Sequence, residues 1–228
     1  MVKINKNDFI EIDYTGKSDG NIFDTTNSKD AKKLGISEPE KVKPLTICVG
    51  NDMVLKGLDE DLEGKETNKE YSIKLTPDKA FGKRDPKMIK TYSINNFKKQ
   101  NINPYPGMAL QLDNTIAKVL SVSGGRVTMD FNNPMAGKDV EYNYKILKKI
   151  TNDKDKINTL QDFFFKQRFE FEIKDKKAIF KEQAIIPIMQ MMAPKFKEMT
   201  GFTFEVFSKK ETTKKEDPKK ETNTEKQQ

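Results

Sequence analysis

The side chains that most enzymes use to move protons near neutral pH are almost missing from this sequence. Its 228 residues include no His and a single Cys, Cys48. That composition excludes His-based general acid–base catalysis, Ser-His-Asp and Cys-His nucleophiles, zinc fingers and a disulfide framework. Chemistry in this chain must therefore rely on carboxylates, hydroxyl groups and backbone dipoles, or must require no side-chain proton transfer.

Aromatic and aliphatic residues stand out instead, in short motifs spread over the first 150 residues. These are Tyr14-Thr15-Gly16, Phe23-Asp24, Val49-Gly50, Val54-Leu55-Lys56-Gly57-Leu58, Pro77-Asp78-Lys79-Ala80-Phe81-Gly82 and Tyr142-Asn143. Taken singly, an aromatic residue is more often part of a hydrophobic core than of a site, and an Asp after a strand is usually a turn residue. Only the order of the motifs together carries information about function.

The remaining polar candidates favour structural roles. Asp59, Glu60 and Asp61 point in different directions on a helix, so we expect a solvated face rather than a metal site or an acid pair. Cys48 lies between two apolar residues of a predicted strand and is most simply a small buried hydrophobic residue.

Hydrophobic spacing predicts the elements that must position these motifs. Alternating apolar residues predict a strand that ends at Tyr14, a hairpin turn over residues 15–21, and strands over residues 45–49, 71–75 and 140–150. The polar residues 25–43 should form a loop that contains a short helix near residues 30–34. Apolar residues at helical spacing between Val54 and Leu62 predict a helix that stops at Gly64.

In this order the motifs resemble those of the FK506-binding-protein (FKBP) family of peptidyl-prolyl isomerases. The β-rich stretch after Phe81-Gly82, closed by residues 133–138, is similar to the insert of the SlyD-like subgroup, and the C-terminal extension is similar to that of long-type archaeal members. The resemblance implies an α+β fold with an FKBP-like antiparallel half-barrel sheet wrapped on a short helix, an inserted mainly-β flap domain, and a small C-terminal α+β domain. The expected boundaries are 1–85 with 133–150, then 86–132, 151–207, and a disordered polar tail over 208–228.

The resemblance also implies which residues form the site. Its walls would be Tyr14, Phe23, Val54, Leu55, Phe81 and Tyr142, with Leu58 as the floor and Asp24 as the one polar wall. The backbone N–H of Leu55, at the start of a helix, would bind the substrate carbonyl before the proline. Three positions depart from the family pattern: Leu58 replaces a common Trp, Phe81 replaces a Tyr, and Tyr142 replaces a Phe. We expect the missing Phe81 hydroxyl to weaken substrate binding.

The implied function is that of a peptidyl-prolyl cis-trans isomerase with chaperone activity, acting on proline-containing unfolded or nascent polypeptides without a metal or an organic cofactor. Rotation about an X-Pro bond faces a barrier of roughly 18–20 kcal/mol and needs no proton transfer by the enzyme, so the absence of His is no handicap. The alternative is a holdase-type chaperone with little isomerase activity. Many SlyD-like members end in a His-rich metal-binding tail, whereas the end of this sequence is rich in Lys, Glu and Thr.

The insert should supply a surface for clients, because in the SlyD-like subgroup it binds extended apolar segments and passes them to the prolyl site. Its sequence predicts a short helix over residues 94–100 and a three-stranded meander over residues 108–112, 115–122 and 126–131. The candidate client-binding residues are Met108, Leu110, Leu112, Ile116, Val119, Val122, Val127, Met129 and Met135. Half of the strand residues must face the insert's own core, and alternation alone does not tell which half.

The C-terminal region predicts a ββαβ unit whose helix, over residues 183–199, carries apolar residues on several faces. So small a unit cannot cover all of them. The alternatives are pairing with a second copy, packing on the other domains, or a Met-rich surface for clients. We expect the first, a homodimer through Ile185, Ile188, Met189 and Met192.

The net charge of +7 is small and spread along the chain, and few of the 42 basic residues are Arg. Nucleic acid is therefore not an expected partner, and an RNA- or ribosome-associated factor is only a third hypothesis. No apolar run approaches the ~18 residues of a membrane span, and the first residues lack the apolar core of a signal peptide. We expect a cytoplasmic protein with no membrane partner.

Overall fold

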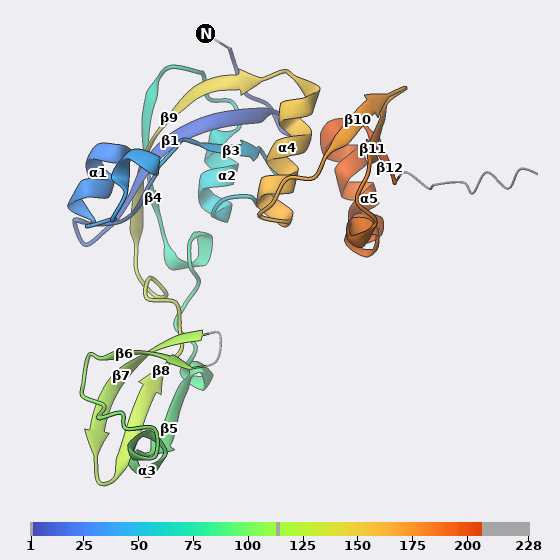
Figure 1. The fold of residues 1–228 in the computed structure, drawn as a ribbon. Helices are drawn as coiled ribbons and strands as arrows, with labels where there is room; N and C mark the ends of the chain where they lie inside the picture. Colours follow the sequence, from blue (N-terminus) through green and yellow to red (C-terminus); the bar gives the residue numbers. More distant parts are fainter. Residues whose placement is uncertain (1, 113–114, 207–228) are drawn as a thin grey trace, which may run out of the picture. The chain divides into compact units, whose positions relative to one another are not determined.

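The computed structural model describes residues 2–112 and 115–206 (Figure 1). By the contacts between residues, the chain divides into two units. The first unit holds the described residues up to 168 together with 198–200, and the second holds 169–197 and 201–206. The predicted disordered tail over residues 208–228 lies outside the described residues.

The first unit is built on a five-stranded antiparallel sheet. Its order is β2 (Asn21–Thr25), β1 (Phe9–Ser18), β9 (Val140–Ile150) and β4 (Glu70–Leu75), and β3 (Leu45–Cys48) pairs with the first half of β1. Buried residues alternate with half-buried ones along β9 from Val140 to Leu147, so one face of the sheet is apolar. The expected antiparallel sheet is therefore present, and every strand predicted for it is found.

The β1–β2 hairpin differs from the sequence expectation. A turn was predicted over residues 15–21, but β1 continues to Ser18, which pairs with Asn21. The turn consists of Asp19 and Gly20, whose φ angles are 50° and 78°. A two-residue turn with two positive φ angles matches the twist of the paired strands, so the ladder extends to the tip of the hairpin.

Helices cover the apolar face and the edge of this sheet (Figure 1). Helix α1 (Ser28–Lys33) follows β2, with Asn27 as its side-chain N-cap, and the short 3₁₀ turn η1 (Pro39–Lys41) lies before β3. Helix α2 (Lys56–Leu62) buries Leu58 and Leu62, four residues apart, and the chain leaves it through Gly64 at φ 82°. Two further 3₁₀ turns, η2 (Pro77–Lys79) and η3 (Pro86–Met88), lead into the insert.

The insert has its own four-stranded sheet, in the order β5 (Ile89–Ser93), β8 (Arg126–Asp130), β7 (Thr115–Ser123) and β6 (Ala109–Leu112), with helix α3 (Ile94–Lys98). Only three of these strands were predicted. Strand β5 exposes all of its residues except Tyr92, which packs on the core, so it lacks the alternating apolar signal of a strand.

The core of the insert consists of Phe97, Leu110, Ala117, Val119, Val127 and Met129. Four of these, Leu110, Val119, Val127 and Met129, are among the residues that the sequence proposed for client binding. Their side chains face inward, which removes them from that surface. Met108, Leu112 and Val122 are half-buried against the same core, Met135 is half-buried near the return to β9, and Ile116 is 69% exposed.

Helix α4 (Asp153–Phe164) follows β9 and belongs to the first unit. It was not predicted. Its apolar residues Ile157, Leu160 and Phe164 fall at helical spacing, so the pattern was present in the sequence although only Ile157 and Leu160 of its apolar residues are buried. The side chain of Asn152 accepts a hydrogen bond from the Asp155 N–H and marks where the helix begins.

The second unit has the order β10 (Phe171–Lys174), β11 (Lys177–Phe180), η4 (Gln183–Ile185), α5 (Ile186–Thr200) and β12 (Thr203–Val206). Strand β11 lies between β10, antiparallel to it, and β12, parallel to it. The helix makes the crossover that a parallel pair requires.

Two of the four residues predicted for a dimer interface lie in the interior of this unit. Ile185 and Met189 are 3% and 2% exposed, so they cannot contact a second copy. Ile188 is exposed and Met192 is half-buried, while Met191, which was not in the predicted interface, is 78% exposed. Among the described residues, no helix is long and apolar enough to cross a membrane.

Candidate active site

A cavity of about 160 Å³ lies in the first unit, on the apolar side of the sheet beside α2. Strands β1, β2, β3 and β9, the segment before α2, α2 itself and the segment after β4 all contribute to it. Its lining residues are Tyr14, Asp24, Leu45, Met53, Val54, Leu55, Leu58, Phe81 and Tyr142. Seven of the eight residues that the sequence proposed for the site are in this lining.

The eighth, Phe23, supports the aromatic wall from the side. Its ring meets Phe81 edge-on with centroids 5.6 Å apart and meets Tyr142 edge-on at 5.9 Å. Tyr14 packs against Tyr142 at 5.6 Å. Edge-to-face contacts of this kind hold rings in one orientation.

The Tyr-Thr-Gly motif follows from this packing. A Cβ on Gly16 would lie 2.9 Å from Phe23 Cζ and 3.1 Å from the Tyr142 ring. Only glycine lets the two aromatic rings approach the backbone of β1 so closely.

One hydrogen bond organises the polar side of the cavity. The Tyr14 hydroxyl donates to Asp24 Oδ2 at 3.0 Å. Burial, and then the charge of Asp24, raise the pKa of Tyr14 above its usual value, and the same two causes raise the pKa of Tyr142. Both phenols are therefore neutral near pH 7, and Tyr14 keeps the proton that it donates.

The segment before α2 is held by a buried carboxylate, which corrects the expectation of a solvated acidic face. Asp59 is 5% exposed, and its two oxygens accept the N–H groups of Gly50 at 2.8 Å and Asp52 at 2.9 Å. The segment that ends in Met53, Val54 and Leu55 is thereby fixed against the helix that supplies the floor.

The other two acidic residues have different roles. Asp61 accepts the Tyr144 hydroxyl at 2.5 Å and pairs with Lys65, and Glu60 pairs with Lys79 on the surface. Of the three acidic residues that were predicted to form a solvated face, only Glu60 lies on the surface as expected.

The Leu55 backbone N–H is placed as the sequence expected, immediately before the first residue of α2. Within the described part of the chain it donates no hydrogen bond, because α2 begins after it and no loop carbonyl reaches it. A free donor beside an apolar cavity can bind a carbonyl group of a ligand.

Two lining residues, Leu45 and Met53, were missed. Leu45 pairs with Ile12, two residues from Tyr14, so the register of β3 on β1 would have pointed to it. The sulfur of Met53 accepts the Cys48 N–H at 3.1 Å, a contact between the end of β3 and the loop after it that no periodic pattern reveals.

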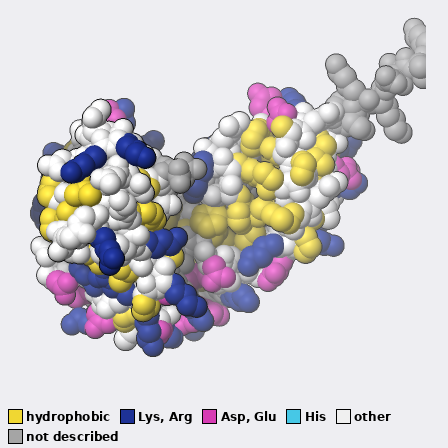
Figure 2. Space-filling view, turned by 90° about the horizontal axis from the view of Figure 1, so that it is seen from below, with side chains coloured by type: hydrophobic (Ala, Val, Ile, Leu, Met, Phe, Trp, Pro, Cys, Tyr) yellow, Lys and Arg dark blue, Asp and Glu magenta, His cyan; other side chains and the backbone are white. Residues whose placement is uncertain are grey.

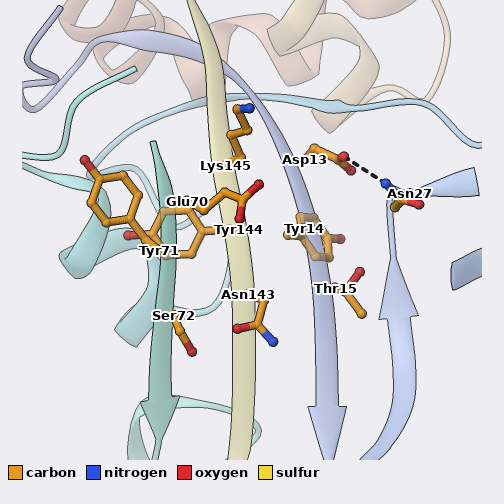
Figure 3. A pocket seen from close by; sticks show the side chains of 10 residues that line it. All are labelled: Asp13, Tyr14, Thr15, Asn27, Glu70, Tyr71, Ser72, Asn143, Tyr144 and Lys145. Carbon is orange, nitrogen blue, oxygen red and sulfur yellow. Dashed lines mark hydrogen bonds between the residues drawn. The ribbon is translucent and has the colours of Figure 1, made fainter. Parts of the chain in front are cut away.

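A larger but polar hollow, of about 470 Å³, lies against the same sheet (Figure 3). Part of its lining consists of Asp13, Asn143 and Lys145. Along β1 and β9 these polar residues alternate with the inward Tyr14, Tyr142 and Tyr144, so the polar residues lie on the solvent side of the strands. The Asn27 amide donates to Asp13 at 3.2 Å. Of the walls that the motifs predicted, this hollow shares only Tyr14, whereas the smaller cavity contains seven of the eight predicted residues and is the better candidate for the site.

No group of three or more Cys, Asp or Glu side chains in the described residues could hold a metal ion. The cavity itself offers one carboxylate, Asp24, among apolar and phenolic side chains. Its chemistry is therefore that of an apolar pocket with a few fixed dipoles.

Comparison with known proteins identifies relatives of this arrangement. A family model described as FKBP-type peptidyl-prolyl cis-trans isomerase matches residues 2–98, and one described as the IF domain of FKBP26 matches residues 92–135. A short-type peptidyl-prolyl cis-trans isomerase of Methanocaldococcus jannaschii is 31% identical over 144 residues, which cover 63% of this chain and 92% of that protein.

Two bacterial relatives extend the comparison. An FKBP-type 16 kDa peptidyl-prolyl cis-trans isomerase of Escherichia coli is 27% identical over 46% of this chain and 73% of its own length. The FKBP-type isomerase SlyD of Aeromonas hydrophila is 24% identical over 60% of each chain.

Proposed function

Because this chain belongs to the FKBP-type peptidyl-prolyl cis-trans isomerases and is an enzyme of that class, we propose that its apolar cavity accelerates X-Pro isomerisation in unfolded or nascent polypeptides. The observation that carries the proposal is the cavity itself, where Tyr14, Phe81 and Tyr142 surround Leu58 beside the free Leu55 N–H. Proline-containing polypeptides are the substrates of the class.

The mechanism follows from the electronic structure of the amide. In the planar ground state, resonance places negative charge on the carbonyl oxygen, which water stabilises, whereas the twisted state has lost that resonance. A prolyl bond in the apolar cavity loses the water, and fixed dipoles replace it. If the cavity lowers the barrier by about 4 kcal/mol, isomerisation accelerates on the order of a thousandfold.

Each polar group has a proposed place in this step. The Leu55 N–H binds the carbonyl that precedes the proline and fixes the substrate as the bond rotates. Asp24 supplies a negative field at one wall, and the Tyr14 hydroxyl fixes the orientation of its carboxylate. The aromatic walls and Leu58 enclose the proline ring and exclude water.

The cavity is tested by isomerisation of a proline tetrapeptide and by refolding of a protein limited by a slow prolyl step. Asp24→Ala and Phe81→Ala should each lower kcat/KM, while Tyr105→Phe, on an exposed residue of the insert, should match the wild type. A wild type that suppresses aggregation but leaves the slow phase unchanged would refute the isomerase and favour the holdase.

We further propose that the insert binds apolar segments of clients through the outer side of β7. Ile116 and Leu120 are 69% and 38% exposed there, whereas the inward residues of the same strand are buried. Ile116→Asp should weaken the suppression of aggregation without loss of tetrapeptide activity. Asn101→Asp, at an exposed residue of the insert outside β7, adds the same single negative charge and is the matched control.

The second unit is proposed to self-associate through α5. Ile188 and Met191 are exposed at three-residue spacing, with Met192 half-buried beside them, and Figure 2 shows hydrophobic side chains gathered on the part of the molecule that leads into the grey C-terminal residues. Ile188→Lys with Met191→Lys should lower the sedimentation coefficient of the full chain at micromolar concentration. Equal sedimentation of wild type and variant would refute the dimer.

A further inference from the structure

Two segments connect the isomerase sheet with the insert, and they are bonded to each other. The outgoing segment is residues 82–88 and the returning segment is residues 130–138. The Gly137 N–H donates to the Gly82 carbonyl at 2.8 Å, and the Phe131 N–H donates to the Met88 carbonyl at 3.0 Å. Between these two backbone contacts lies a cluster of polar side chains.

Asp130 and Asn132 form the returning half of this cluster. The Asp130 side chain is 8% exposed, and its Oδ1 accepts the Asn132 backbone N–H at 2.9 Å and side-chain amide at 2.7 Å. The same Asn132 side chain accepts the Asp85 N–H at 2.9 Å and donates to the Asp85 carbonyl at 3.1 Å. Both hydrogen-bonding groups of the amide are thus used to join the two segments.

Arg84 completes the cluster from the outgoing segment. Its guanidinium group pairs with Oδ2 of Asp130, so both oxygens of that buried carboxylate are satisfied. The Cγ and backbone N of Arg84 lie 3.7 Å from where a Cβ of Gly137 would be, so Arg84 packs on the returning segment as well. It stands three residues after Phe81, a wall of the cavity.

We propose that Arg84, Asp85, Asp130 and Asn132 form a linker clasp that positions the insert to deliver a bound polypeptide to the prolyl cavity. The inference rests on the proposed function. A segment held by the insert reaches the cavity at an effective concentration that depends on the stiffness of the two connections. Bonds between the connections restrict their motion, so the clasp residues act as positioning residues and do not touch the prolyl bond.

The clasp should affect a protein substrate and a short peptide differently, which residues needed only for folding would not do. A tetrapeptide binds the cavity directly and gains nothing from the insert, whereas an unfolded protein can contact both. Opening the clasp should therefore lower kcat/KM for the protein substrate alone, chiefly through KM.

The test compares wild type, Arg84→Gln with Asn132→Ala, and the control Lys83→Gln. Lys83 is the neighbour of Arg84 and loses the same charge, but its ammonium group lies 3.6 Å from Asp78 on the exposed surface and outside the clasp. The double variant should lower kcat/KM for refolding on the order of tenfold and leave the tetrapeptide value within about twofold. Lys83→Gln should match the wild type on both substrates.

Amide hydrogen exchange of β5 and β8 shows whether the insert stays folded. If the double variant unfolds the insert, Arg84→Gln alone is tested, because it keeps the hydrogen bonds of Asn132, and it should still lower kcat/KM for the protein substrate. Arg84→Lys keeps a cation near Asp130 and should recover at least half of that loss. An unchanged protein-substrate value, an equal loss on both substrates, or no recovery by Lys in a folded insert would overturn the clasp. A wild type with no preference for the protein substrate would instead refute the proposed delivery function, and the role of the clasp with it.

Discussion

At the scale of single residues, Tyr14 and Asp24 form a hydrogen-bonded pair in the wall of the cavity. Burial raises the pKa of the phenol further above neutral pH, so the hydroxyl keeps its proton and donates a hydrogen bond to the Asp24 carboxylate at 3.0 Å. Neither residue is informative alone, since a Tyr in a strand and an Asp after a strand are both common. Their bond turns two ordinary residues into an oriented dipole at the wall of the cavity.

Removal of the Tyr14 phenol oxygen should separate the orientation of the Asp24 carboxylate from the shape of the cavity. Tyr14→Phe keeps the ring against Tyr142 but leaves Asp24 without its donor. A hydrogen bond to a charged group contributes about 1.5–3 kcal/mol, so kcat/KM for a tetrapeptide should fall about tenfold or more. The measurement is the protease-coupled isomerisation rate, with circular dichroism as the check on folding. A rate equal to that of the wild type would show that the orientation of Asp24 does not matter.

Phe81 offers the opposite test, a gain of function. The family usually has a Tyr at this position, and the ring of Phe81 lines the cavity beside Phe23. Phe81→Tyr adds a hydroxyl that can bind the substrate, so KM should fall by a few fold, on the order of 0.5–1.5 kcal/mol for one neutral hydrogen bond. A KM that rises instead would mean that the hydroxyl is desolvated without a partner.

At the scale of elements, the loop before α2 depends on a carboxylate from the helix that follows it. Asp59→Asn keeps one acceptor but turns an amide N–H toward the backbone N–H of Gly50 or Asp52. The change should destabilise the protein by about 1–3 kcal/mol and lower kcat/KM, because Leu55 follows this loop. Urea unfolding and the tetrapeptide assay measure the two effects.

Glu60→Gln is the matched control on the same helix. Its surface pair with Lys79 is screened by solvent, so the substitution should change the free energy of unfolding little and leave catalysis unchanged. Equal effects of the two substitutions would contradict the special role of Asp59.

The elements that could be predicted are those with one continuous buried face. Strand β9 was predicted over residues 140–150, the bounds that the structure shows, because every second residue from Val140 to Ile146 packs inward. Strand β5 was missed because only Tyr92 of its residues packs inward, whereas helix α4 was missed although Ile157, Leu160 and Phe164 fall at helical spacing. The burial of Asp59 had no local signal either, since its partners are the backbone N–H groups of a loop.

The site was predictable for a related reason. Its walls come from strands and a helix whose positions are fixed by the sheet, and the motif order specified seven of the nine lining residues. The inward face of β7 was not predictable, because this strand carries apolar residues on both sides, as the core residue Val119 and the exposed Ile116 show.

At the scale of the whole molecule, three buried phenols link stability to alkaline pH. Burial and Asp24 raise the pKa of Tyr14 and Tyr142, and burial and a hydrogen bond to Asp61 raise that of Tyr144, which also stacks on Tyr71. The unfolded chain has phenols of ordinary pKa, about 10. Below that pH both states hold all three protons, so these groups make no difference to the pH dependence.

Above about pH 10 the unfolded chain releases these protons while the folded chain keeps them. The free energy of unfolding must then fall as pH rises, by about 1.4 kcal/mol per pH unit for each phenol, until the folded protein also titrates. Urea unfolding followed by far-UV circular dichroism should give a constant stability from pH 7 to about 9 and a steep loss above about 10. Tyr144→Phe should lower the free energy of unfolding at neutral pH. Above about pH 10 it should reduce the slope of that free energy against pH by the share of one phenol. Tyr105→Phe, on an exposed ring, should leave the slope unchanged. An alkaline slope that is the same in wild type and Tyr144→Phe would contradict the assignment of that proton to the buried phenol.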